Sequence, residues 1–176
     1  MPVYFWDDRD GSKYKNAYFL TFPSIWHHGD FIRISEKGSL KIYGRSDSTL
    51  NPGGVRIGTS EIYRVVNSID IIEDSLVIGQ EWEGDQRIIL FVLMVDDLPL
   101  KRDMIDQIKF QIKNNCSLRH IPSKIIKVRG IPYTINGKKV EIAVKNIIEG
   151  KTVTNIESLS NPETLSQFRN IPELLN

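Results

Sequence analysis

Hydrophobic and polar residues alternate in several short segments, and this pattern predicts β-strands. The segments 31–35 (FIRIS) and 39–43 flank the turn EKG and predict a β-hairpin. The segments 75–82 (SLVIGQEW) and 86–95 (QRIILFVLMV) flank EGD and predict a second hairpin, more apolar and therefore central. A fifth strand is expected within 123–130 (SKIIKVRG).

Three other segments have apolar residues at helical spacing. A helix is expected to begin near Thr59, with Thr59 or Ser60 as its cap and Glu61 close to the positive end of its dipole. The other two helices are expected within 98–115 and 140–148. The residues predicted to face the core are Ile62, Val65, Val66 and Ile69 in the first helix, Met104, Ile105, Ile108 and Ile112 in the second, and Ile142, Val144 and Ile148 in the third.

Together these elements predict an α+β fold with a central antiparallel or mixed sheet of about three strands, flanked by helices. We expect residues 46–150 to form a small compact domain and 151–176 a loosely packed tail with about one helical turn. Residues 1–45 are crowded with aromatic and charged side chains. Exposed aromatic side chains at this density are typical of the edge of something larger.

Composition and charge exclude several classes of protein. The net charge of +1, without a block of one sign, does not favour nucleic acid or an acidic membrane as a partner. The longest apolar run, 88–95, is too short to cross a bilayer. The single cysteine, Cys116, excludes an internal disulfide and a cysteine-rich zinc site, and we expect a mostly buried thiol. The first residues lack the pattern of a secretory signal, so a cytoplasmic location is predicted.

Local sequence gives only weak signals of chemistry. His27, His28 and His120 lack metal-ligand spacing, and no metal site is predicted. Arg45 and Arg56 bracket the glycine-rich segment NPGG, and guanidinium groups near exposed backbone amides suit phosphate, although arginines near turns are common.

Two further segments carry a charged residue beside a glycine. Asp30, in HGD, could accept hydrogen bonds from a ribose diol or cap its own loop. In PYTINGKKVE, two adjacent lysines follow a glycine, where an ordinary solvated turn is the simpler interpretation.

Taken together and in order, HGD, YGRSD…GGVRIGTSEIY and IPYTINGKKVE resemble the C-terminal signature of the adenylate-forming acyl-CoA synthetases. Within this family the sequence most resembles the branch that acts on acetoacetate, notably in the segments MPVYFWDDRDG, KYKNAYF and WHHGD. The resemblance implies an AMP-forming ligase that activates a carboxylate with ATP and passes the acyl group to coenzyme A. Its substrates would be ATP, acetoacetate and coenzyme A, with Mg²⁺ held by ligands outside this chain.

The resemblance also assigns residues, position by position. It implies that the nucleotide is held by Asp30 and Arg45 at the ribose and by Arg56 at a phosphate. It implies a hinge at Asp47, a coenzyme A channel along Gly53 and Gly54, and Lys138 as the lysine that reaches the reacting oxygens during adenylation. Many relatives have other residues where this chain has Tyr133, Asn136 and Glu141. Three basic residues could contact the phosphates of coenzyme A: Lys113, Arg119 and Lys124. The sequence does not favour any one of them.

The same family has a large N-terminal adenylating domain with a phosphate loop that is not found here. The resemblance implies that residues 1–45, with their hairpin, are the last segment of that domain. We therefore expect a C-terminal fragment, inactive alone, whether truncated, split or excised. A free-standing nucleotide-sensing or regulatory module without catalysis is the alternative.

Overall fold

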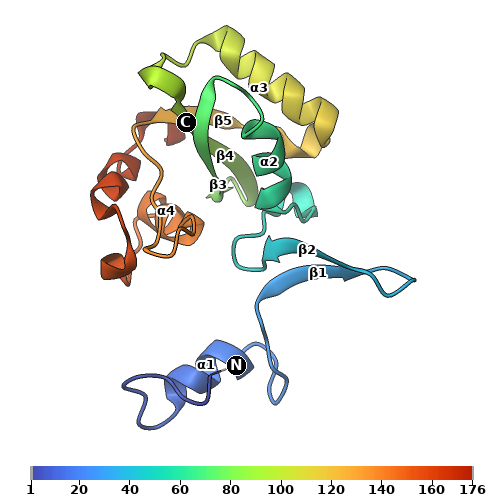
Figure 1. The fold of residues 1–176 in the computed structure, drawn as a ribbon, viewed down its shortest axis with the longest axis vertical. Coiled ribbons are helices and arrows are strands. Elements are labelled where there is room, and N and C mark those ends of the chain that lie inside the picture. The colour runs from blue at the N-terminus through green and yellow to red at the C-terminus, as the bar shows by residue number, and fades with distance from the viewer. Residues whose placement is uncertain (1, 176) are drawn as a thin grey trace. The chain divides into compact units, whose positions relative to one another are not determined.

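The computed structural model describes residues 2–175, and within them every side chain except that of Tyr43. The chain divides into two compact units, residues 1–30 and 31–176. The elements are shown in Figure 1. None of the helices in the described part is long and apolar enough to cross a membrane.

The first unit contains helix α1 (Ser12–Phe19), which the sequence pattern did not predict. The carboxylate of Asp8 accepts hydrogen bonds from the backbone amides of Lys13 and Tyr14, at 2.9 and 2.8 Å, and so satisfies donors that a helix start leaves free. The rings of Phe5, Tyr14 and Tyr18 pack edge to face, with centroids 5.2–5.7 Å apart. Local capping and aromatic contacts therefore replace an apolar stripe in this helix.

Strands β1 (Asp30–Ile34) and β2 (Leu40–Arg45) form the predicted hairpin. The backbone amide of Ser35 donates to the carbonyl of Ser39 at 2.8 Å, which closes the turn. This pairing places Ile34 opposite Leu40 and Ile32 opposite Ile42, on one face. All four are exposed, between 42% and 64%.

The central sheet has three strands, β3 (Ile72–Trp82), β4 (Asp85–Met94) and β5 (Lys124–Val128), in the order β3-β4-β5. β3 and β4 are antiparallel, whereas β4 and β5 are parallel. The parallel pair requires a crossover, and helix α3 (Arg102–Asn115) lies in that connection. The predicted α+β class with a mixed three-stranded sheet is confirmed.

Successive residues of the strands point to opposite faces, and each face has its own core. Val77, Leu90 and Val92 pack on one side with α3 and helix α2 (Thr59–Val66). Leu76 and Phe91 pack on the other side with helix α4 (Glu141–Ile148) and residues of the C-terminal segment. In Figure 1, α2 and α3 accordingly lie across the sheet from α4.

Two details of the predicted helices are wrong. The N-cap of α2 is Gly58, without a side-chain hydrogen bond, and Thr59 is instead buried as the first helical residue. In α4 the inward positions are Val144 and Ile147, one turn apart, so Ile142 points away from the core and is 44% exposed.

The predicted loose packing of 151–176 is also wrong. Three short 3₁₀ helices occupy Ile156–Ser158, Pro162–Phe168 and Pro172–Leu174. Four apolar side chains of this segment are buried in the second core: Leu159, Leu165, Phe168 and Leu174. Two of these helices begin with a proline. Proline has no backbone N–H, and at the first position of a helix that group would have no partner within the helix, so no hydrogen bond is lost.

Cys116 is only partly buried, beside the first core, and its Sγ lies 3.5 Å from the carbonyl oxygen of Glu61, to which it donates. Burial raises the pKa of this thiol. His120 contacts Ser117 Oγ at 2.8 Å and Glu61 Oε2 at 3.2 Å, which fits the structural role expected for it.

Candidate functional site

The turn between Tyr133 and Lys139 is a short closed loop. The amide of Thr134 donates to the carbonyl of Lys138 at 2.8 Å, and the amide of Gly137 donates to the carbonyl of Thr134 at 2.8 Å. The amide of Lys138 adds a bond to Thr134 Oγ1 at 3.1 Å. Gly137 has φ 71°, a conformation that glycine adopts without strain. This turn presents the two adjacent lysines.

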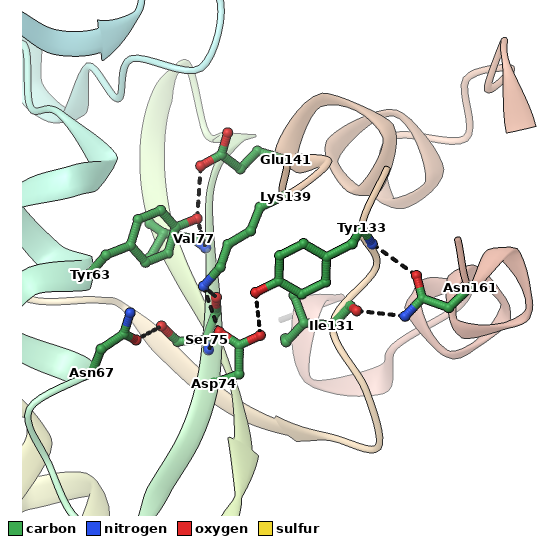
Figure 2. A network of polar contacts seen from close by, with 10 residues as sticks. All are labelled: Tyr63, Asn67, Asp74, Ser75, Val77, Ile131, Tyr133, Lys139, Glu141 and Asn161. Carbon is green, nitrogen blue, oxygen red and sulfur yellow. Dashed lines mark hydrogen bonds and ion pairs between the residues drawn. The ribbon is translucent and has the colours of Figure 1, made fainter. Parts of the chain in front are cut away.

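The two lysines have different surroundings. Lys139 Nζ donates to Asp74 Oδ1 at 2.6 Å and to the carbonyl of Ser75 at 2.5 Å, and its side chain is 18% exposed (Figure 2). Lys138 is exposed, and we find no ion pair or hydrogen bond of its ammonium within residues 2–175. Helix α4 begins at Glu141, so Lys139 belongs to the turn and closes it.

A cavity of about 330 Å³ brings Lys138 together with Arg45 and Asp47. The Arg45 side chain lies 3.5 Å from Asp47, measured from Nε to Oδ1, and both are about half exposed. The first turn of α4 forms another wall, with Glu141, Ile142 and Ala143 among the lining residues. Lys139 also contributes to the lining, and further polar residues there are Ser48, Thr134, Asn146, Thr154, Asn155 and Ser158.

The structure does not bring every predicted residue to this cavity. Arg56 lines a separate cavity of about 250 Å³ with Phe31, and its Cζ lies 5.4 Å from the centroid of that ring. Asp30 belongs to the first unit, where its Oδ2 lies 2.5 Å from Nδ1 of His28.

The glycine pair lies against the turn of the β3–β4 hairpin. The amide of Gly53 donates to both carboxylate oxygens of Asp85, at 3.0 Å each. Gly53 and Gly54 have φ values of 56° and 75°, which favour glycine. A Cβ added to Gly53 would lie 3.2 Å from Nη1 of Arg119.

Of the three basic residues considered for coenzyme A, Arg119 is therefore the one found at the glycines. The Asp85 contact was missed by the sequence reading, because the two residues are 32 positions apart and no local signal links them.

Glu141 is a partly buried carboxyl group that lines the cavity. The hydroxyl of Tyr63 donates to its Oε1 at 2.8 Å and accepts from the amide of Val77 at 3.0 Å (Figure 2). Burial raises the pKa of Glu141, and the hydrogen bond from Tyr63 opposes this only in part. Burial, together with the nearby charge of Glu141, also raises the pKa of the Tyr63 hydroxyl.

The raised pKa of Glu141 predicts a specific dependence of stability on pH. Because the folded pKa lies above the unfolded value, the contribution of Glu141 is fully present below the unfolded pKa and is lost as the pH rises through the folded one. We expect Glu141→Gln, which stays neutral, to gain in free energy of unfolding relative to the parent chain as the pH is raised from about 4, near the unfolded pKa of a glutamate, into the neutral range.

Urea unfolding across that range measures this difference, with the exposed Glu36→Gln as control. A Glu141→Gln variant that keeps a constant difference from the parent chain at every pH would contradict the expectation.

Comparison with known proteins shows which proteins this chain resembles. No family model matches the chain. Acetoacetyl-CoA synthetase of Mus musculus is 50% identical to it over 176 residues, which cover 99% of this chain and 26% of the mouse protein. Acetoacetyl-coenzyme A synthetase of Rhizobium meliloti (strain 1021) is 49% identical over 174 residues, or 99% of this chain and 27% of that protein. The chain is homologous to the C-terminal part of acetoacetyl-CoA synthetase. It spans about a quarter of the length of these relatives.

The solved structures agree in fold. Acetoacetyl-CoA synthetase from Streptomyces lividans matches all of this chain, and 27% of its own, with a TM-score of 0.88 and 39% identity. The anthranilate CoA ligase AuaEII, solved with anthranoyl-AMP, matches 65% of this chain and 22% of its own, with a TM-score of 0.58 at 22% identity. The second likeness is one of fold alone, whereas homology to the acetoacetyl-CoA synthetases extends over the whole chain.

Proposed function

We propose that this chain is the mobile C-terminal part of an acetoacetate–CoA ligase and supplies the adenylation lysine, Lys138. The observation that carries the proposal is the contrast between the two lysines of one turn. Lys139 is held by Asp74, whereas the ammonium of Lys138 is left for a ligand and shares a cavity with Arg45. Homology to acetoacetyl-CoA synthetases over 99% of the chain supports the choice of reaction.

The reaction has two steps. In the first, a carboxylate oxygen of acetoacetate attacks the α-phosphorus of ATP, and the bond to pyrophosphate breaks. Carboxylate and triphosphate repel each other, so the ammonium of Lys138 offsets this charge and stabilises the charge that develops on the oxygens. In the second step the thiolate of coenzyme A attacks the acyl carbonyl, and AMP leaves. The second step needs no cation at that place, so a rotation about Asp47 can remove Lys138.

The remaining assignments follow the same proposal. Asp30 and Arg45 bind the ribose of the nucleotide, and Arg56 binds a phosphate, for which a planar guanidinium has the matching geometry. Gly53 and Gly54 line the channel for coenzyme A, with Arg119 next to Gly53 as a phosphate contact. Within residues 2–175 there is no group of three or more His, Cys, Asp or Glu residues that could hold a metal ion. We assign the Mg²⁺ ligands to the rest of the enzyme.

The acyl and adenine pockets are assigned to a large adenylating domain with which this chain works. One supporting observation is the exposed apolar face of the β1–β2 hairpin, formed by Ile32, Ile34, Leu40 and Ile42. Apolar side chains side by side on a two-stranded sheet are a typical interface, because such a hairpin cannot bury them alone. The partition into 1–45, 46–150 and 151–176 and the cytoplasmic location remain predictions from sequence.

The purified 176-residue chain is expected to show no acetoacetate-dependent consumption of coenzyme A, because it contains only part of the site. The measurement follows the loss of free thiol with ATP, acetoacetate and Mg²⁺ present. A protein that carries this chain together with an adenylating domain is the positive control. Turnover by the chain alone would contradict the proposal. Calorimetry with AMP tests the other function class, since tight binding by the chain alone would favour a nucleotide-sensing module.

A further inference from the structure

A single carboxylate ties both ends of the lysine turn to the sheet (Figure 2). Asp74, on β3, accepts from Lys139 Nζ with Oδ1 and from the hydroxyl of Tyr133 with Oδ2, each at 2.6 Å. Tyr133 and Lys139 are the first and last residues of the turn, and they also pair as an antiparallel bridge. The turn is therefore closed at its base and fixed to a central strand.

Further contacts hold each end of the turn. Lys139 Nζ also donates to the carbonyl of Ser75, a residue with no exposed surface, and lies 4.4 Å from the centroid of the Tyr63 ring. The amide of Tyr133 donates to Asn161 Oδ1 at 2.9 Å, and Asn161 returns a bond to the carbonyl of Ile131, also at 2.9 Å (Figure 2). The lysine end is thus held by α2 and β3, and the tyrosine end by the C-terminal segment.

This anchoring has a direct consequence for the neighbouring lysine. Lys139 is directed toward β3 and held there by its bonds to Asp74 and Ser75, so its ammonium is occupied. Lys138 is exposed and lines the cavity shared with Arg45 and Asp47. The charge of Lys139 is already balanced by Asp74 and cannot replace that of Lys138.

We propose that Lys139, Asp74 and Tyr133 are positioning residues that hold the Lys138 turn in the geometry needed for adenylation. The proposal rests on the adenylation role of Lys138 and adds what fixes its direction. A displacement of about 1 Å of a catalytic group can lower a rate about 100-fold, so an anchor of this kind controls the rate without touching substrate.

The test uses a protein that carries this chain with an adenylating domain and measures the two half-reactions separately. Acetoacetate-dependent exchange of pyrophosphate into ATP reports adenylation. Release of coenzyme A thiol from acetoacetyl-CoA and AMP reports the second step in reverse. We expect Lys139→Met to lower kcat of the exchange about 10- to 100-fold and to change thiol release less than about 2-fold. Lys139→Arg, which keeps the charge and its donors, should recover part of the exchange.

Lys127→Met is the matched control. Lys127 also pairs with a carboxylate and a backbone carbonyl, both of Asp97, but lies on β5 away from the turn. It should change neither half-reaction.

Tyr133→Phe provides a milder variant, because it removes only the hydroxyl bond to Asp74. If Lys139→Met does not fold, a selective loss of exchange in Tyr133→Phe supports the anchor, and an unchanged exchange overturns it.

The outcomes separate this proposal from the one on which it rests. If Lys138→Ala keeps full exchange, the role of Lys138 is wrong. If Lys138→Ala loses exchange but Lys139→Met keeps it, only the anchor is wrong. If Lys139→Met lowers both half-reactions together, it acts on folding and the positioning role is overturned. Trace acetylation of the 176-residue chain adds a readout independent of activity, in which Lys138 should react at least about 10-fold faster than Lys139, and equal rates would overturn the anchor.

Discussion

Replacing Lys138 with alanine is expected to lower acetoacetate-dependent ATP–pyrophosphate exchange by about 100- to 1000-fold in a protein that joins this chain to an adenylating domain. The exchange requires the step in which carboxylate and triphosphate meet, and in the proposed role the ammonium of Lys138 would offset their repulsion. Thiol release from acetoacetyl-CoA and AMP should stay within about 2-fold, because the charge that Lys138 is proposed to stabilise does not develop there. Separate assays of the two half-reactions measure the difference.

Two variants control this result. Lys37→Ala removes an exposed lysine from the β1–β2 turn and should leave the exchange unchanged. Lys138→Arg keeps the charge but replaces a compact ammonium with a planar group, so the exchange should recover only in part. An equal fall in both half-reactions would mean that Lys138 supports the domain rather than adenylation.

Elements with a strict hydrophobic period could be predicted from the sequence. Strand β4 is apolar on both faces because each face packs in a core, and its run at 88–95 revealed this directly. Helices α2 and α3 have one apolar face, so their core residues were also predicted correctly. In these segments burial follows local spacing, and a reader of the sequence needs nothing else.

The C-terminal segment could not be predicted in this way. Its buried residues Leu159, Leu165, Phe168 and Leu174 lie six, three and six positions apart, a spacing that fits neither a helix nor a strand. Each is buried because the sheet and α4 leave an apolar face there, which is a property of the fold. The residues between them are polar, and this composition is typical of a loosely packed tail, which is what the sequence predicted.

The prediction of the candidate site from the sequence was limited for the same reason. Nothing local distinguishes Lys138 from Lys139; what separates them is Asp74, which is 65 positions away from Lys139 in the sequence. The resemblance to a family chose Lys138, and the contacts of Lys139 give an independent physical reason for that choice. Tyr133 and Glu141, noted as departures from the family pattern, form hydrogen bonds with Asp74 and Tyr63, respectively.

Phe168→Ala is expected to lower the free energy of unfolding by about 3–5 kcal/mol, the range for removing a buried phenylalanine. The Phe168 side chain has no exposed surface, and its ring packs edge to face on that of Phe91, with centroids 4.9 Å apart at 88°. Alanine would leave a cavity against the central strand, and the contact between the two rings would be lost as well. Urea unfolding of the 176-residue chain, followed by far-ultraviolet circular dichroism, measures the change.

Phe110→Ala is the matched control, because Phe110 lies on α3 and is 60% exposed. Its removal should change the free energy of unfolding by less than about 0.5 kcal/mol. A Phe168→Ala variant as stable as Phe110→Ala would mean that the C-terminal segment does not contribute to the folded unit. Since Asn161 of the same segment holds Tyr133, a large effect would also mean that the segment and the lysine turn are stabilised by one core.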